Sequence, residues 1–150
     1  MIRTEHEYQR ALLGLERDAE AMEAQRAQLR KRGVEGEGLK LAMQPMESFR
    51  QQLEEEVHAY ERMKRGVFDV LHSLTGIGRW LIAIRISRGM TQRELAERLG
   101  VSEAQVSRDE RHEYYGITVE RAQRILEALG ARFRMEIDEV SVEHEVLAST

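Results

Sequence analysis

Apolar residues in the first 66 positions recur at alternating spacings of four and three, and this period constrains the fold more than any other feature. In the first stretch the positions are Tyr8, Leu12, Leu15, Ala19, Met22, Arg26 and Leu29, of which only Arg26 is charged. Such a stripe is typical of a helix in a coiled coil or of a helix packed nearly parallel to another. Because the chain has a single proline and almost no β-branched runs before residue 131, we expect a mainly α protein.

Glycines divide this N-terminal part into two helices. The glycines of RGVEGEG, residues 32–38, predict a loop that reverses the chain. Pro45 predicts the start of the second helix, since proline is tolerated in a first helical turn. The apolar positions of that helix are Met46, Phe49, Leu53, Val57, Tyr60 and Met63. We expect residues 1–66 to form either an antiparallel helical hairpin within one chain or a dimeric coiled coil.

A second pattern, of compact helices separated by glycines, follows this module. Residues 67–76 predict a short connecting helix. The helices expected after it are Ile77 to Arg88, Gln92 to Leu99, Glu103 to about Arg111, and Val119 to Leu129. Thr91 stands three residues before Glu94, and Ser102 three before Gln105, so both pairs fit a capping box. Thr118 fits a simpler N-cap.

The period changes after Gly130 from helical to alternating. Phe133, Met135 and Ile137 fall on one side of an extended chain. The segment 131–150 is therefore expected to hold a single β-strand, over residues 132–137, and an acidic tail. A lone strand has unpaired edges, so it needs a two-fold mate or a strand of another protein, unless the segment stays a flexible tail.

The segment TQRELAERLGVSEAQVSR, from Thr91 to Arg108, is the most specific part of the sequence. It places two short helices on either side of a tight turn at Gly100, which can take a positive φ. Ala96 is small where the helices must cross, and apolar contacts come from Leu95, Leu99, Val101 and Val106. With IGRWLIAIRISRGMTQ before it, the segment resembles the helix-turn-helix domain of the phage-repressor and Cro class, also called the XRE class. The resemblance spans Ile77 to about Gly130 and implies a domain of four to five helices.

The resemblance also implies which residues meet DNA. The helix after Ser102 would lie in the major groove as the recognition helix. Carried over by position, the DNA-binding residues are Gln92, Ser102, Glu103, Ala104, Ser107, Arg108 and Arg111. Gln92 would clamp a phosphate, Arg108 would donate two hydrogen bonds to guanine, and Ala104 would meet a thymine methyl. Ser107 would contact base or phosphate, and Arg111 would reach backbone phosphates. Glu103 would need a cytosine or a local cation.

Two further positions follow from the class pattern. It implies a buried structural ion pair between Arg85 of the first helix and Glu110 of the third. Asp109 departs from the pattern, because the class usually has an apolar side chain there. We expect Asp109 either to cap or pair locally, for example with an arginine, or to change the packing at the end of the recognition helix.

Charge is distributed unevenly along the chain. The whole chain has a formal net charge of -4, which argues against a nucleic-acid binder. Residues 77–134, however, hold eleven arginines and eight acidic residues, a local net of +3. Arginine favours bidentate recognition of phosphate and guanine. The local charge therefore suits DNA.

These observations predict a sequence-specific regulator of transcription that binds double-stranded DNA as a homodimeric repressor, with dimer contacts from the N-terminal helices, the C-terminal strand or both. The alternative is an antitoxin that binds a toxin protein and represses their shared operon, because IRTEHEYQRAL and LGARFRMEI look like segments of some helix-turn-helix antitoxins.

No phosphate-binding glycine loop, nucleophile with its base or metal-ligand spacing occurs, so we expect no enzyme, no cofactor and no metal. The chain has no cysteine and no long apolar run, and we expect a cytoplasmic protein without a membrane partner.

Overall fold

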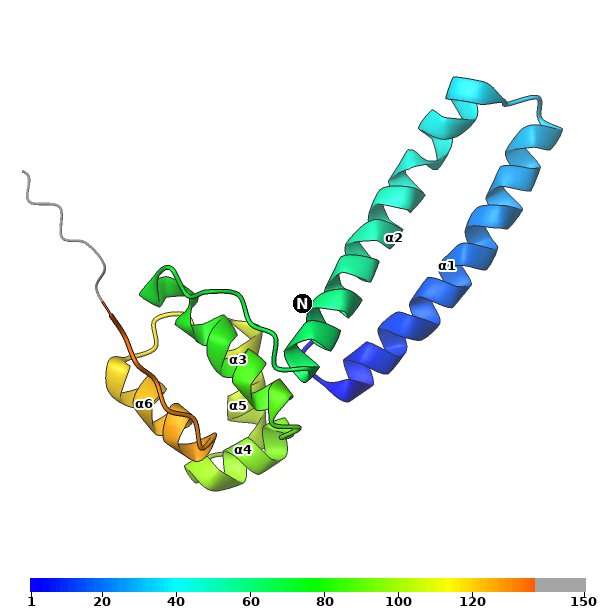
Figure 1. Ribbon diagram of the computed structural model, residues 1–150. Helices are drawn as coiled ribbons and strands as arrows, with labels where there is room; N and C mark the ends of the chain where they lie inside the picture. The colour runs from blue at the N-terminus through cyan, green and yellow to red at the C-terminus, as the bar shows by residue number, and fades with distance from the viewer. Residues whose placement is uncertain (137–150) are drawn as a thin grey trace, which may run out of the picture.

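The computed structural model describes residues 1–136, and these residues form a long helical arm on a compact helical bundle (Figure 1). The arm consists of α1 (Glu5–Lys31) and α2 (Gly36–Lys64). A 3₁₀ turn, η1 (Leu74–Gly76), precedes the bundle. The bundle consists of α3 (Ile77–Ser87), α4 (Gln92–Leu99), α5 (Glu103–Arg111) and α6 (Val119–Ala128). Within residues 1–136 no helix is long and apolar enough to cross a membrane.

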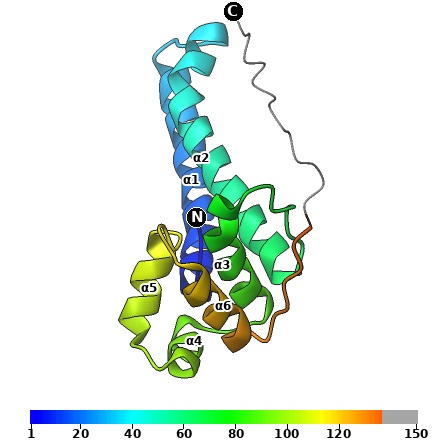
Figure 2. The same ribbon diagram turned by 90° about the vertical axis from the view of Figure 1, so that its left-hand side faces the viewer.

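The two helices of the arm run antiparallel and pack on each other within one chain (Figures 1 and 2). Of the two arrangements left open by the sequence, the structure therefore has the hairpin. Met22 of α1 and Met43 and Val57 of α2 are buried between the helices. Near the base of the arm, the rings of Tyr8 and Tyr60 stack with their centroids 5.0 Å apart.

The start of α2 differs from the prediction. The helix begins at Gly36 and not at Pro45, which lies in its interior. A proline inside a helix leaves the carbonyl four residues earlier without a partner, here that of Leu41. Leu41 is 71% exposed, so water can solvate this carbonyl. The longer helix buries Met43, whereas Phe49, expected in the apolar stripe, is 64% exposed.

The connecting segment also differs from the prediction. Of residues 67–76, only the short 3₁₀ turn η1 is helical. A short isolated helix is marginal in water unless tertiary packing covers an apolar face. Val67 and Val70 are 54% and 73% exposed, so a helix here would lack that support.

The predicted C-terminal strand is wrong for the residues that the structure describes. Residues 131–136 form neither helix nor strand, and no β-strand occurs anywhere in residues 1–136. The physical reason is the absence of a partner strand, because the rest of the described chain is helical. Phe133 and Met135 accordingly remain 46% and 61% exposed. Ile137 and the acidic tail lie outside the described residues.

The bundle helices begin where the sequence predicts and end within one residue of the predicted positions. Thr91 and Glu94 form a full capping box at the start of α4. Ser102 accepts the N–H of Gln105, and Thr118 accepts that of Arg121. The Gln105 side chain does not return to the Ser102 backbone, so this second box is only half formed.

One apolar core joins the arm to the bundle. Ile2, just before α1, and Val57 and Tyr60 of α2 belong to the same buried cluster as Leu81, Ile82 and Ile125 of the bundle. In addition, the Arg85 guanidinium donates from Nη2 to the carbonyl of Arg3, at 2.9 Å. The base of the arm is therefore part of the framework that supports α3.

Candidate DNA-binding site

The turn between α4 and α5 sets the angle between these two helices. Gly100 has a φ of 69°, in the left-handed region, and ends α4. The N–H of Val101 then bonds to the carbonyl of Ala96 at 3.0 Å. Ala96 is 2% exposed, and Leu95 and Val106 are each 1% exposed. Val101 remains 39% exposed, so it contributes less to this contact than the sequence indicates.

The expected DNA-contacting residues of the second helix gather on one exposed surface, the recognition face. Glu103, Ser107 and Arg111 follow one another at intervals of four residues, so they lie on one side of α5. Ala104 and Arg108 have the same spacing and lie next to them. Ser107 is half-buried, and the other members are exposed. The recognition face comprises Ser102, Glu103, Ala104, Ser107, Arg108 and Arg111.

Gln105 positions one member of this face, Arg108, and its neighbour Asp109, a role that the sequence did not predict. Its side-chain oxygen accepts from Nη2 of Arg108 at 2.9 Å, and its Nε2 donates to Oδ1 of Asp109 at 2.8 Å. The spacing of three and four residues along a helix is the available signal. Gln105 thereby ties the guanidinium of Arg108 to the body of α5.

Asp109 connects the recognition helix to α6. Its Oδ2 accepts from Nη2 of Arg121 at 2.5 Å. Of the alternatives considered for this departure from the class pattern, the structure has the pairing with an arginine. The carboxylate is held between Gln105 and Arg121, so the C-terminal half of α5 keeps its helical geometry up to Arg111.

Gln92 is turned towards the interior. Its Nε2 donates to Oε2 of Glu110 at 2.8 Å, and its side chain is half-buried. The amide lies at the N-terminus of α4, the position at which the resemblance to the class implies a phosphate contact. To reach a phosphate with its side chain, Gln92 must first leave Glu110.

Arg85 and Glu110 form a bidentate ion pair between α3 and α5. Nε donates to Oε1 at 2.5 Å and Nη2 to Oε2 at 2.7 Å, while the side chains are 3% and 0% exposed. Nη1 and Nη2 of Arg85 also donate to the carbonyls of Met90 and Arg3, respectively. Arg3 lies 82 positions away in the sequence, so no local pattern indicates its part in this network.

The loop after α5 packs tightly on the start of α3. Glu113 and Tyr114 have φ values of 52° and 53°, in the left-handed region that non-glycine residues rarely adopt. A Cβ on Gly78 would lie 1.8 Å from the carbonyl oxygen of Glu113, so only glycine fits there. Tyr114 is 5% exposed and cannot reach DNA in this conformation. Its hydroxyl has no hydrogen-bond partner among the described residues, and burial raises the pKa of Tyr114.

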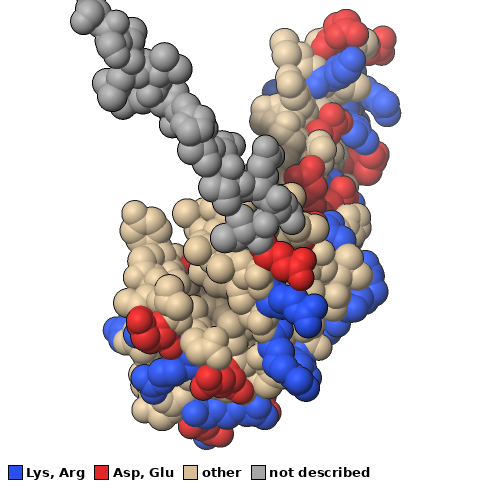
Figure 3. All heavy atoms as spheres, turned by 60° about the vertical axis from the view of Figure 1, so that its left-hand side comes forward, with Lys and Arg blue, Asp and Glu red and all other residues tan. Residues whose placement is uncertain are grey.

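The charges of the bundle are mixed at its surface. In the view of Figure 3, arginine side chains lie along the lower and right edges of the bundle, interspersed with acidic ones. Arg88, Arg93, Arg98 and Arg124 are exposed outside the recognition face, so the excess of arginine in this segment is not confined to that face.

These elements, two short helices joined by a left-handed glycine turn with a polar, arginine-bearing face on the second, define a helix-turn-helix domain. Residues 81–134 match the family described as helix-turn-helix, and this segment is a DNA-binding domain of the XRE class. A domain of this class indicates a DNA-binding regulator of transcription. No curated protein and no solved structure matches the chain.

Proposed function

We propose that the chain is a sequence-specific repressor that binds a two-fold operator as a homodimer. The observation that carries this proposal is the exposed recognition face. On it, the side-chain oxygen of Gln105 accepts a hydrogen bond from Nη2 of Arg108 at 2.9 Å, which orients the guanidinium. A guanidinium held in this way can donate two hydrogen bonds to a guanine edge. We assign DNA reading to residues 77–130 and dimerisation to the helical module of residues 1–66.

Each residue of the site has a role in this proposal. Arg108 reads guanine, and Ala104 meets a thymine methyl. Ser102, Ser107 and Arg111 contact the phosphate backbone or base edges, and Gln92 clamps a phosphate after it leaves Glu110. Glu103 accepts from a cytosine amino group. The ion pair of Arg85 with Glu110 supports the site without contacting DNA.

The modest net charge of the helix-turn-helix domain favours binding of DNA by two copies of the chain. A local net charge of +3 gives few phosphate contacts, so one domain alone binds DNA weakly. Two helix-turn-helix domains joined in a dimer bind DNA more tightly than one, without any new type of contact. The arm offers exposed apolar side chains for this contact: Leu13, Leu41 and Phe49 are 53%, 71% and 64% exposed.

Selection from random duplex DNA at moderate salt tests the proposal. We expect an enriched motif of two inverted half-sites, separated by about one helical turn or a multiple of it. A motif without two-fold symmetry, together with a monomeric mass in solution, would contradict the homodimer. The absence of any enriched motif would contradict the proposed function as a whole.

A second candidate is an antitoxin that binds a toxin protein and represses their shared operon. The exposed apolar side chains of Phe133 and Met135 favour it, because such residues are available to a protein partner. Co-expression with the neighbouring genes separates the two candidates. A small protein that co-purifies in a fixed ratio and whose toxicity this chain suppresses would support the antitoxin. A gene neighbourhood without a toxic product would count against it.

A further inference from the structure

The outer half of the arm carries an apolar surface that no other part of the described chain covers. Leu41, Pro45 and Phe49 of α2 follow one another at intervals of four residues, so they lie on one side of the helix. Leu41 is 71% exposed and Phe49 is 64% exposed. Ala42 and Met46 lie next to this row. We call these five residues the arm face.

A groove runs along the edge of the arm face that is nearest to α1. It has a volume of about 240 Å³. Its walls are formed by Pro45, Met46 and Phe49 of α2 and by Asp18 and Met22 of α1. Asp18 is its one charged residue and belongs to the α1 wall. The apolar surface therefore continues from Phe49 to the line where the two helices of the arm meet.

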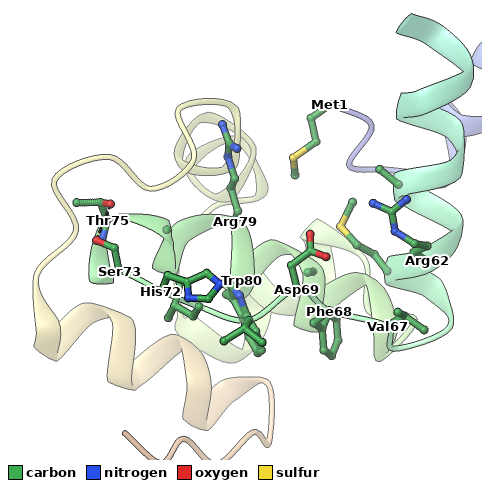
Figure 4. A pocket seen from close by; sticks show the side chains of 16 residues that line it. Met1, Arg62, Val67, Phe68, Asp69, His72, Ser73, Thr75, Arg79 and Trp80 are labelled. Atoms are coloured by element: carbon green, nitrogen blue, oxygen red, sulfur yellow. Dashed lines mark hydrogen bonds between the residues drawn. The ribbon is translucent and has the colours of Figure 1, made fainter. Parts of the chain in front are cut away.

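Towards the base of the arm, the same side of α2 is covered by the chain itself. Met63 lies about five helical turns after Pro45 and therefore on the same side of the helix. It lines a cavity of about 390 Å³, whose other walls include Phe68 of the connecting segment and Trp80 of α3 (Figure 4). The part of this side that is free to contact another molecule is thus the arm face.

The charged side chains in this part of α2 are held away from the arm face. Between residues 41 and 52 they are Glu47 and Arg50. Glu47 pairs with Arg26 of α1, and Arg50 pairs with Glu54, each with an N–O distance of 2.9 Å. These contacts keep both charges within the arm, and the arm face itself carries none.

A surface without charge favours contact with a second copy of the chain. Two identical chains repel each other through their net charge of -4, so they associate at least cost where no charged side chains meet. Leu13 of α1, which is 53% exposed, does not meet this condition. Its neighbours one helical turn away include Arg10, Glu16 and Arg17. The arm face does meet it.

The spacing of residues along the arm face favours a helix as the contacting element. Ala42, Pro45, Phe49 and Gln52 recur at intervals of three and four residues, the spacing at which two helices pack nearly parallel. Around a two-fold axis that runs along such a pair, each residue meets its own copy. The two Phe49 rings then pack against each other and remove their exposed apolar area from water.

We propose that two chains dimerise through the arm face, with their α2 helices parallel about a two-fold axis along the arms. The inference rests on the proposed function, since it names the contact surface of the homodimer. Figures 1 and 2 show the bundle at one end of the arm and the turn between α1 and α2 at the other. Parallel arms therefore bring both helix-turn-helix domains to the same end.

Antiparallel arms would not bring the two domains together. With the contact centred on Pro45, the two ends of α2 would lie about 57 Å apart at a rise of about 1.5 Å per residue. Neighbouring half-sites of an operator are separated by roughly 34 Å. The parallel arrangement is the one that places two recognition helices side by side at the base of the arms.

Sedimentation equilibrium of the full chain tests the contact surface. We expect a reversible monomer–dimer equilibrium with a micromolar Kd, because the arm face is smaller than a standard protein interface. Phe49→Glu brings two like charges together in the contact and should raise this Kd about tenfold or more. Leu13→Glu introduces the same charge at a side chain of similar exposure outside the arm face and should leave the Kd unchanged. Far-UV circular dichroism checks that both variants keep their helices.

Single cysteines test the direction of the arms. The chain has no cysteine, so each introduced thiol is the only one. Gln52→Cys should form a disulfide between two chains of a parallel dimer, because residue 52 then meets its own copy. Gln51→Cys places a thiol on another side of α2 and should cross-link at least about fivefold more slowly. A dimer whose Gln52→Cys variant does not cross-link would overturn the parallel arrangement.

Binding to the selected operator connects the arm face to DNA. The Phe49→Glu variant should bind a single half-site as tightly as the wild type does. Its Kd for the two-fold operator should be about tenfold higher than that of the wild type, because the two domains no longer bind as one unit.

The outcomes separate this inference from the proposed function. If the wild type and the Phe49→Glu variant dimerise with equal affinity, the arm face is wrong and the homodimer stands. If the wild type is a monomer at every concentration and on its operator, both the arm face and the homodimer are wrong. If selection yields no operator, the proposed function fails, whereas sedimentation and cross-linking still decide the arm face.

Discussion

The guanidinium of Arg85 meets the carboxylate of Glu110 edge to edge inside the bundle, with N–O distances of 2.5 and 2.7 Å. The same carboxylate accepts from Gln92 at the start of α4, and the same guanidinium donates to the backbone of Arg3, just before the arm. This one pair therefore fixes α3, α4, α5 and the start of the arm relative to one another. Its burial makes the arrangement sensitive to the loss of either partner.

Arg85→Ala should lower the free energy of unfolding by about 3 to 5 kcal/mol, because it leaves the Glu110 carboxylate buried without a partner. Urea denaturation followed by far-UV circular dichroism measures this loss. The double change of Arg85 to Met and Glu110 to Leu removes both charges and should be less damaging than Arg85→Ala alone. A loss below about 1 kcal/mol for Arg85→Ala would show that the carboxylate is solvated or protonated in the variant.

Arg108→Ala should reduce discrimination at one guanine of the operator by about 1 to 3 kcal/mol, because it removes the bidentate contact to a base edge that we propose for this residue. Competition titrations with operators that differ at single positions measure the effect. Arg17→Ala, on the exposed side of α1, removes the same charge and serves as the control. A uniform weakening across all sequences would reassign Arg108 to a phosphate contact.

Gly78→Ala should destabilise the bundle by about 3 kcal/mol, because the new Cβ collides with the carbonyl oxygen of Glu113. That oxygen belongs to the backbone, so no side-chain rotation relieves the contact. In Gly14→Ala the new Cβ lies 3.5 Å from a side-chain carbon of Leu53, an ordinary contact. This control should stabilise α1 by about 0.5 to 1 kcal/mol. Equal denaturation midpoints for the two variants would contradict the close approach at Gly78.

Tyr114→Phe should raise the free energy of unfolding by about 1 kcal/mol, because it removes a buried hydroxyl that has no partner in the described chain. The aromatic ring keeps its place in the core. Thermal denaturation at constant pH measures the change. If the variant is less stable than the wild type, the hydroxyl has a partner in solution, such as a bound water.

The capping box at Thr91 predicts a pH dependence of stability. Hydrogen bonds from the backbone N–H and the hydroxyl of Thr91 lower the pKa of Glu94 below its ordinary value of 4.5. A carboxyl group with a lowered pKa in the folded state adds stability above its unfolded pKa and loses it as the pH falls through the folded pKa. Urea midpoints of the wild type and the Glu94→Gln variant should therefore converge as the pH falls below about 4. A constant difference between them across this range would contradict the prediction.

The helix-turn-helix segment was predictable because its signals are local. Capping residues, the glycine of the turn and the small residue at the crossing each act within a few positions of the chain, so the sequence predicts α4 and α5 with their bounds. The same local rules are wrong at Pro45, because an exposed proline inside a long packed helix is tolerated. They are also wrong for the strand after Gly130, because an alternating pattern does not provide the second strand that pairing requires.

The sequence by itself determined the helical class of this protein, the turn at Gly100 and the surface position of Arg108. Only the tertiary structure decided what surrounds these residues. It turned Gln92 inward to Glu110, joined Arg85 to the backbone of Arg3, and opposed Gly78 to the carbonyl of Glu113. These contacts join residues far apart in the chain, and their geometry depends on how whole helices pack, which no short pattern of residues encodes.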